Sequence, residues 1–326
     1  MDTEQLLRYS CRNRAIQYPI HLEAMSRIEL LHQRARASGF AGGLLITGFT
    51  GSGKTTVKKE YASRFPRKDE GDRTRIPVLC VDTPSAPTAK SLAEAILIEL
   101  GDAMSYRGTA EQKTQRIYHL FKLCKVELLI IDEFQQFFEH GRRNEIGRVM
   151  DWLKNMLNNA GIPVVLMGLP YSDQVLRLNV QLARRFSSRH YLRPFRFGTP
   201  EEVLEFRGIL SAIENNLPLP SSSLSHPEMA QRFYYATCGL IDFIGKIIDG
   251  AVMLAHRHGN KRLDELLFAE AFEEEIWREA PKELNPFVAK QEHLRLFNKA
   301  GEPFALIESS PVLGTGRIGT SVKRQW

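Results

Sequence analysis

The sequence GFTGSGKT at residues 48–55 matches the pattern GxxxxGK[ST] of phosphate-binding loops. Its glycines let backbone N–H groups converge on phosphate oxygens, and the helix that follows adds its dipole. Lys54 is expected to reach the β- and γ-phosphates, and the Thr55 hydroxyl to bind magnesium. An apolar run precedes the loop and a helix-prone segment follows it, which is the context that the pattern requires. The predicted nucleotide contacts are Gly48, Thr50, Gly51, Ser52, Gly53, Lys54, Thr55 and Thr56.

A second motif, LLIIDE at residues 128–133, follows about 80 residues after the loop. Asp132 ends an apolar strand and is predicted to hold magnesium, and Glu133 stands where it can polarise a water for attack on the γ-phosphate. Two carboxylates favour hydrolysis over binding alone. The guanine-specific pattern NKxD is absent, since Asn298-Lys299-Ala300-Gly301 lacks the aspartate. The predicted cofactors are therefore ATP and Mg²⁺.

Strands and helices alternate through the first 200 residues, which predicts an α/β fold with a parallel sheet flanked by helices. The expected strands are residues 44–47, 76–81, 127–132, 162–167 and 190–192, and the expected helices 55–65, 88–100, 109–125, 147–159 and 173–186. After Pro200 the pattern becomes helical, at residues 200–215, 228–237, 240–256 and 262–280. The expected organisation is an N-terminal helical segment (1–38), a nucleotide-binding domain (39–199), a small helical lid (200–283) and a C-terminal segment (284–326) that ends in a flexible tail from residue 301.

Composition narrows the class of protein. Of the 326 residues, 43% are hydrophobic and 25% charged, as in globular chains, which excludes a disordered or fibrous protein. No apolar stretch is long enough to cross a membrane, and the charged N-terminus is not a secretion signal, so a cytoplasmic protein is expected. The four cysteines are too scattered for a disulfide framework or a metal site. The net charge is +6, with six arginines and no acid in residues 177–200 and eight acids in residues 264–283.

A third motif, QLARRF at residues 181–186, follows one strand after Asp132 and Glu133. Arg185, or its neighbour Arg184, is a candidate arginine finger that stabilises transition-state charge in the site of a neighbouring subunit. With these three motifs and a helical lid, the chain resembles an AAA+ ATPase. IIDEFQQF, VMDWLKNMLNNAGIPVVLMGLP and QLARRF, in that order, resemble the TnsC/TniB family of transposition regulators of bacterial transposons, some of them CRISPR-associated; the resemblance covers roughly residues 20–260.

The resemblance implies a regulator that assembles with ATP into rings or filaments on double-stranded DNA, independently of DNA sequence. It would connect a target-selector protein to the transposase, and ATP hydrolysis would disassemble it. Basic residues facing a central pore would contact DNA phosphates without reading the bases. The candidates for these contacts are Lys113, Arg116, Arg142 and Arg143. The acidic segment 264–283 and the tail are candidate docking surfaces for the partner proteins.

Two positions depart from the AAA+ pattern. A polar sensor residue usually ends the fourth strand, but here that strand runs into Met167-Gly168-Leu169-Pro170, and Ser172 is the nearest hydroxyl. The lid usually carries a sensor arginine, but here Asp242 stands at that place. Lys246, one helical turn later, is the candidate substitute for a nucleotide contact. These departures predict unusual control of hydrolysis and slow turnover.

Three other functions compete with a transposition regulator. An AAA+ initiator or helicase loader of DNA replication is the main alternative, and it would carry an added DNA-reading module. A nucleotide or small-molecule kinase would use the same phosphate loop, but the pair of carboxylates at Asp132 and Glu133 disfavours it. A scaffold that binds ATP and barely hydrolyses it is the third.

Overall fold

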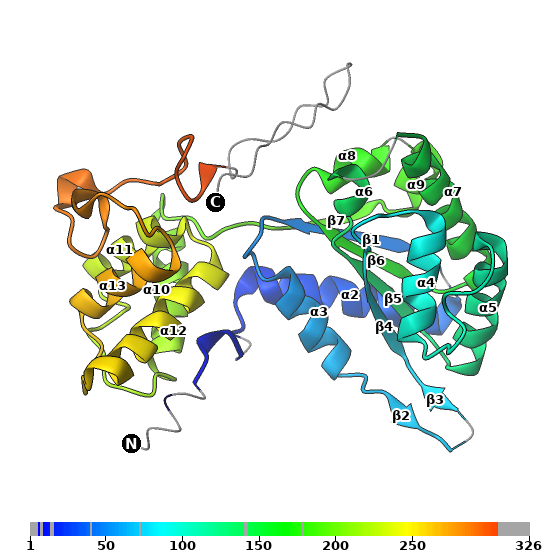
Figure 1. Ribbon diagram of the computed structural model, residues 1–326, viewed down its shortest axis with the longest axis horizontal. Helices are drawn as coiled ribbons and strands as arrows, with labels where there is room; N and C mark the ends of the chain where they lie inside the picture. Colours follow the sequence, from blue (N-terminus) through cyan, green and yellow to red (C-terminus); the bar gives the residue numbers. More distant parts are fainter. Residues whose placement is uncertain are drawn as a thin grey trace.

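The computed structural model describes residue 6 and residues 9–13, 16–39, 41–71, 73–139, 143–177 and 179–305. Figure 1 shows an α/β unit and a helical unit, joined by the chain between residues 192 and 200. The N-terminal segment reaches both, because η1 (Cys11–Asn13) contacts the helical unit and α2 (Pro19–Ser38) lies on the sheet.

Five strands form one sheet in the order β4-β5-β6-β1-β7, and every neighbouring pair is parallel. Most of their residues are buried, which explains why the strands are near-continuous apolar runs. The predicted parallel sheet and the positions of its strands are confirmed. The bounds are β1 (Gly43–Gly48), β4 (Val78–Asp82), β5 (Leu128–Asp132), β6 (Val164–Gly168) and β7 (Ser188–Leu192).

Helices cover both faces of the sheet because successive strand residues point to opposite sides. Leu44 and Ile46 pack in the layer of α2 and α3 (Lys54–Ser63). Leu45, between them, packs in the other layer. That layer contains α4 (Ala89–Glu99), α5 (Ala110–Leu123) and α7 (Arg143–Ala160). In Figure 1 these three helices lie across the sheet from α2 and α3.

The parallel arrangement brings the carboxyl ends of β1, β5 and β6 to one edge of the sheet, with β6 between the other two. The loops that follow these strands, residues 49–53, 133–135 and 169–171, therefore lie close together. Ligands of open α/β sheets bind at this edge.

Four helices form the second unit around a core of phenylalanines that includes Phe206, Phe233 and Phe268. A capping box at Thr199 begins the first of them, where the Thr199 hydroxyl accepts the Glu202 N–H and the Glu202 carboxylate accepts the Thr199 N–H. The helices are α10 (Pro200–Glu214), α11 (Pro227–Thr237), α12 (Ile241–His258) and α13 (Glu265–Glu275).

One predicted helix, residues 173–186, is wrong, because two short helices occupy that stretch. They are α8 (Ser172–Arg177) and α9 (Val180–Arg185). The Asn179 side chain accepts the Leu182 N–H at 3.0 Å and so starts a new helix where the first would have continued. The sequence also did not predict the hairpin β2 (Lys68–Asp69) and β3 (Thr74–Arg75) or the single turn α6 (Gln136–Glu139).

The C-terminal segment packs on the helical unit as far as it is described. After η2 (Lys282–Leu284) and η3 (Gln291–His293), Arg295 forms an ion pair with Glu302 at 2.5 Å. Phe304 is buried edge-to-face against Phe243, with ring centroids 5.0 Å apart. The expected flexible tail is therefore wrong for residues 301–305, and residues 306–326 lie outside the described part. In that described part, no helix is both long and apolar enough to cross a membrane.

Candidate nucleotide-binding site

The phosphate loop folds as its glycines require. Gly51 and Gly53 have φ angles of +80° and +95°, the left-handed region that favours glycine. A Cβ atom on Gly51 would also lie 3.1 Å from the Phe243 ring of the helical unit. The absence of a side chain at Gly51 therefore lets the start of α12 pack closely against the loop.

Lys54 begins α3 and is buried beneath the loop. Its Nζ donates hydrogen bonds to the carbonyl oxygens of Gly48, at 2.7 Å, and Phe49, at 2.9 Å. Burial lowers the pKa of Lys54, while the nearby charges of Asp132 and Glu133 partly offset that effect. The loop thus already points the lysine toward its own concave side.

A cleft of about 270 Å³, partly open to solvent, lies between the two units. The phosphate loop forms its floor, and Glu133, Gln135 and Leu169 form one wall. Of the predicted nucleotide contacts, six line it: Thr50, Gly51, Gly53, Lys54, Thr55 and Thr56. The other two support the floor: the carbonyls of Gly48 and Ser52 accept bonds from Lys54 and Tyr18, and the Ser52 side chain is buried.

The opposite wall comes from the N-terminal segment and α12. The Tyr18 hydroxyl donates to the Ser52 carbonyl at 3.3 Å, and the Asp242 N–H donates to the Gly51 carbonyl at 3.1 Å. Arg12 lines the cleft, with its Nε 2.9 Å from Asp249 of α12. The N-terminal segment and the helical unit thus each form a hydrogen bond with the phosphate loop, and an ion pair joins them to each other beside the cleft.

The acid at the end of β5 has partners on both oxygens. Asp132 is 1% exposed; its Oδ1 accepts the Glu133 N–H at 2.8 Å, and its Oδ2 lies 2.8 Å from Lys58 Nζ. Lys58 also pairs with Asp82, the last residue of β4, at 2.5 Å. Burial alone would lower the pKa of Lys58, but the hydrogen bonds with Asp132 and Asp82 raise it above its ordinary value. A charged lysine therefore sits beside the predicted magnesium ligand.

These residues fit a magnesium ion. The Thr55 hydroxyl and the Asp132 carboxylate are hard oxygen donors of the kind that Mg²⁺ prefers. Thr55 lines the cleft, and Asp132 ends the strand next but one in the sheet. Lys58 would share Asp132 with the ion.

Glu133 adopts a φ angle of +55°, which is unusual for a residue with a side chain. Its carboxylate accepts a hydrogen bond from the Gln135 side-chain amide. The Gln135 Oε1 in turn accepts the Leu169 N–H, at 3.2 Å, in the loop after β6. The predicted general base is thus held at the cleft wall by a neighbour two residues away.

A model of the family described as "Bacterial TniB protein" matches residues 7–195, which is more than half of the chain. The chain belongs to the TniB family. This confirms the resemblance that the motifs indicate, to an AAA+ ATPase of the TniB/TnsC type. No curated protein matches the sequence closely enough to count as a relative.

Three of the solved structures that are similar to this TniB chain share little sequence identity with it. The ORC1 protein of Aeropyrum pernix in complex with DNA has 14% identity and a TM-score of 0.61, covering 84% of this chain and 69% of its own. The ORC2 protein of the same organism, with ADPNP and ADP, has 16% identity and a TM-score of 0.59, covering 77% and 67%. Cdc6p of Pyrobaculum aerophilum has 13% identity and a TM-score of 0.58, covering 84% and 71%. The likeness confirms the fold, a P-loop sheet followed by a helical region.

The lid lysine of the TniB chain does not reach the cleft. Lys246 pairs with Asp242 at 3.1 Å, and its Nζ lies 4.4 Å from the centre of the Phe243 ring. Asp242 itself lines the cleft instead. Ser172, the nearest hydroxyl to the end of β6, is fully buried and is not among the described residues that line the cleft.

The two candidate arginine fingers lie away from this cleft. Arg184 and Arg185 end α9, which Figure 1 places far from the helical unit, and both are exposed. Phe186 follows them and is buried; a Cβ on Gly43 would lie 2.4 Å from its ring. The phenylalanine thus anchors the end of α9 beneath β1 while the arginines face outward.

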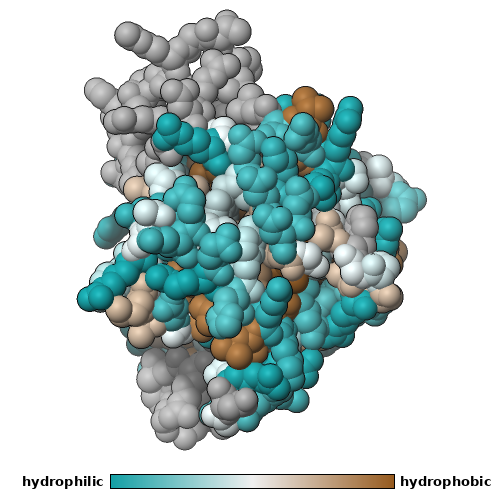
Figure 2. Space-filling view, turned by 90° about the vertical axis from the view of Figure 1, so that its right-hand side faces the viewer, coloured by the Kyte–Doolittle hydropathy of each residue, from teal (hydrophilic) through white to brown (hydrophobic). Residues whose placement is uncertain are grey.

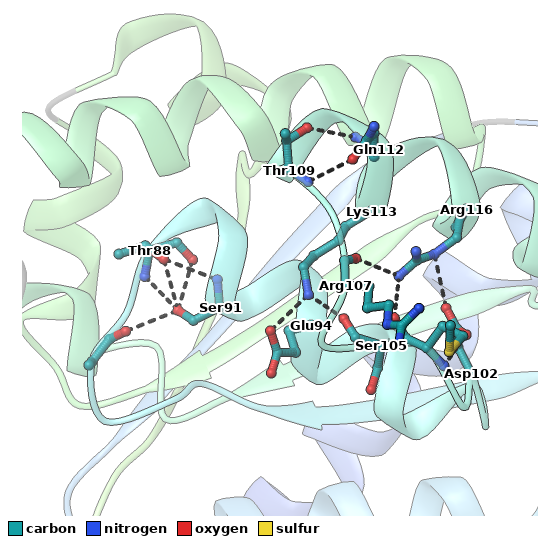
Figure 3. A network of polar contacts seen from close by, with 12 residues as sticks. Thr88, Ser91, Glu94, Asp102, Ser105, Arg107, Thr109, Gln112, Lys113 and Arg116 are labelled. Atoms are coloured by element: carbon teal, nitrogen blue, oxygen red, sulfur yellow. Dashed lines mark hydrogen bonds and ion pairs between the residues drawn. The ribbon is translucent and has the colours of Figure 1, made fainter.

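Figure 3 shows the surroundings of two predicted DNA contacts, Lys113 and Arg116. Lys113 is fully buried; its Nζ forms an ion pair with Glu94 at 2.8 Å and donates to the Ser105 carbonyl. Arg116 pairs with Asp102 at 3.0 Å and donates to the carbonyls of Met104 and Arg107. Both cations hold the loop of residues 101–109 in place. The prediction is wrong for Lys113, which is buried, whereas Arg116, with a side chain 34% exposed, stays a candidate DNA contact.

The remaining two predicted DNA contacts are not placed. Arg142 lies outside the described residues, and Arg143 begins α7 with its side chain outside them too. Figure 2 views the α/β unit from the side away from the helical unit; that face is mostly hydrophilic, with small apolar patches. It offers polar groups rather than a broad apolar docking surface.

Lys58, Gln135, Tyr18 and Arg12 are site residues that the sequence analysis missed. Only Lys58 carried a readable signal, since it lies four residues after Lys54 and therefore on the same face of α3. Tyr18 and Arg12 reach the cleft through tertiary packing of the N-terminal segment, which no local pattern reveals.

Proposed function

We propose that this protein is an ATP-hydrolysing switch that assembles on DNA and regulates transposition. The observation that carries the proposal is the cleft itself: a phosphate loop with Lys54 and a carboxylate, Glu133, face one cavity that the helical unit closes. Asp242 of α12 donates its N–H to the Gly51 carbonyl of the phosphate loop. A phosphate bound by the loop would therefore change the position of the helical unit if it moved Gly51.

The residues have distinct roles in hydrolysis. Lys54 and the loop N–H groups bind the β- and γ-phosphates. Glu133 accepts a proton from a water whose oxygen forms a bond to the γ-phosphorus, while the bond from that phosphorus to the ADP oxygen breaks. Mg²⁺, held by Thr55 and Asp132, would neutralise phosphate charge. Arg184 or Arg185, absent from the cleft of its own subunit, would complete the site of a neighbour.

We place the DNA contact of the proposed assembly on the loop of residues 101–109, to which Lys113 and Arg116 donate hydrogen bonds. Arg107 and Tyr106 are exposed at its tip, with the Arg107 guanidinium 5.5 Å from the centre of the Tyr106 ring. An exposed arginine beside an aromatic ring suits the DNA backbone. The transposase and the target selector remain the proposed partners, supported by membership of the TniB family.

Steady-state ATP hydrolysis, with and without duplex DNA, tests this function. The Glu133→Gln variant should lose at least about 100-fold in kcat, because it lacks the base, and keep its affinity for a fluorescent ATP analogue. The Lys54→Ala variant should lose that affinity. Wild-type protein that binds no ATP analogue, or a Glu133→Gln variant that hydrolyses ATP at the wild-type rate, would contradict the proposal.

A further inference from the structure

The end of β6 lacks the polar side chain that the AAA+ pattern places there, and the structure shows what occupies that space. β6 ends at Gly168, and a Cβ atom on this residue would lie 3.0 Å from the Gln135 Oε1 and 2.4 Å from the Ser172 Oγ. The glycine therefore leaves room for a side chain that arrives from the neighbouring strand.

Gln135 fills this room with both ends of its amide in use. It is 4% exposed, its Nε2 donates to the Glu133 carboxylate, and its Oε1 accepts the Leu169 N–H at 3.2 Å. A backbone bond fixes the same junction, since the Phe134 N–H donates to the Met167 carbonyl at 2.9 Å. The amide is thus oriented by two partners and cannot rotate without losing one of them.

Glu133 needs such a neighbour. Its backbone has a left-handed φ of +55°, and its side chain has three rotatable bonds on a loop that faces the open cleft. A general base acts only when its carboxylate lies within hydrogen-bond reach of the proton it takes. Of the hydrogen bonds described for the Glu133 side chain, the one from Gln135 holds it to the sheet edge.

We infer that Gln135 is the positioning residue for Glu133, and that it supplies from the loop after β5 the polar group that β6 lacks. The inference rests on the proposed ATP hydrolysis and names a residue that controls it. It also explains how a chain with Gly168 in place of a sensor residue keeps its general base aligned.

Two substitutions of Gln135 separate positioning from packing. Gln135→Ala removes both hydrogen bonds. Gln135→Glu keeps the shape and the oxygen that accepts the Leu169 N–H, but it removes the donor to Glu133. Gln136→Ala is the matched control, because Gln136 is the same residue type, begins α6 directly after Gln135 and is not among the residues that line the cleft.

Both Gln135 variants should lower kcat about tenfold, the weight of one charge-assisted hydrogen bond, and leave KM within about twofold. Their affinity for an ATP analogue, measured by fluorescence, should also stay within about twofold, because no described hydrogen bond joins Gln135 to the phosphate loop. Assemblies on DNA should consequently disassemble more slowly after ATP is added. The control should match the wild type in all these measurements.

Wild-type kcat in Gln135→Glu would overturn the inference, because the amide would then serve only the Leu169 N–H. If Gln135→Ala fails to fold, Gln135→Met serves instead, since it keeps the length of the side chain and makes neither hydrogen bond, and an unchanged kcat there would equally overturn the inference. Wild-type protein that binds the analogue without hydrolysing ATP would refute the proposed function itself, which distinguishes the two failures.

Discussion

The Nζ atom of Lys58 lies 2.8 Å from the Oδ2 atom of Asp132, in a region where both side chains are almost entirely buried. Lys58 belongs to α3, the helix that follows the phosphate loop. Asp132 is the predicted magnesium ligand and the last residue of β5. This ion pair, extended to Asp82 of β4, ties three elements together directly beneath the nucleotide cleft. The ion pair therefore stabilises the fold and also holds the predicted magnesium ligand in place.

Replacing Lys58 with methionine should destabilise the protein by about 3 kcal/mol, because a buried carboxylate is left without its cation. Urea unfolding at neutral pH measures the free energy. Lys59→Met is the control, since Lys59 is exposed on the same helix and should change stability by less than about 0.5 kcal/mol. Equal stability of the two variants would show that the pair contributes nothing.

We expect Lys113 to contribute to stability and Arg107 to contribute to DNA binding. Lys113→Met should cost about 2 kcal/mol of stability, because it removes the bonds to Glu94 and Ser105. Arg107→Ala should leave stability within about 0.5 kcal/mol and lower the slope of log affinity against log salt for duplex DNA by about 0.9 per lost phosphate contact. Unchanged DNA affinity and salt slope in Arg107→Ala would exclude the loop tip as the DNA contact.

Stability should fall in acid partly through Glu127, which joins α2 to β5. Its carboxylate bonds to Arg75 at 3.0 Å and His32 at 3.2 Å, and also to Arg36. Burial alone would raise the pKa of Glu127, but the hydrogen bonds with Arg36 and Arg75 lower it below its ordinary value.

A lowered carboxyl pKa adds stability above the unfolded pKa, about 4.3, and this stability is lost as pH falls through the folded pKa. The Glu127→Gln variant should therefore be less stable than the wild type at pH 7 by about 1 kcal/mol. The difference should shrink as pH falls below about 4. Unfolding curves across this range measure it, and a difference that is independent of pH would refute the role of the charge.

An arginine finger that acts between subunits predicts complementation. Arg185→Ala keeps Glu133, and Glu133→Gln keeps Arg185, so each variant alone should be nearly inactive in ATP hydrolysis. Mixing them should restore part of the activity, because some interfaces then pair an intact arginine with an intact glutamate. If mixing restores nothing while the Arg185→Ala variant alone is inactive, Arg185 acts within its own subunit or only in folding. The same pair of experiments with Arg184→Ala decides between the two arginines.

The strands and the phosphate loop were predictable because their signals are local. A buried parallel strand must be apolar along its length, and the spacing of GFTGSGKT is fixed by the phosphates that such loops bind. The break between α8 and α9 was missed because the Asn179 cap competes with helix continuation, and periodicity does not register that competition.

The error at Lys113 has a physical cause that the sequence also contained. Lys113, Ile117 and Phe121 recur every four residues on α5, and all three are buried. A lysine in line with two apolar residues belongs to the buried face, so its charge alone was a poor guide to DNA contact. Gln135 was unpredictable for the opposite reason, because its role depends on the space left by Gly168, 33 residues away.

The most direct test of the central claim is the size of the protein on duplex DNA of arbitrary sequence, with and without a slowly hydrolysed ATP analogue. Sedimentation combined with negative-stain imaging measures it. The account predicts rings or filaments that form on DNA only with the analogue and that are lost in the Lys54→Ala variant. A monomer that ignores DNA under both conditions would contradict it.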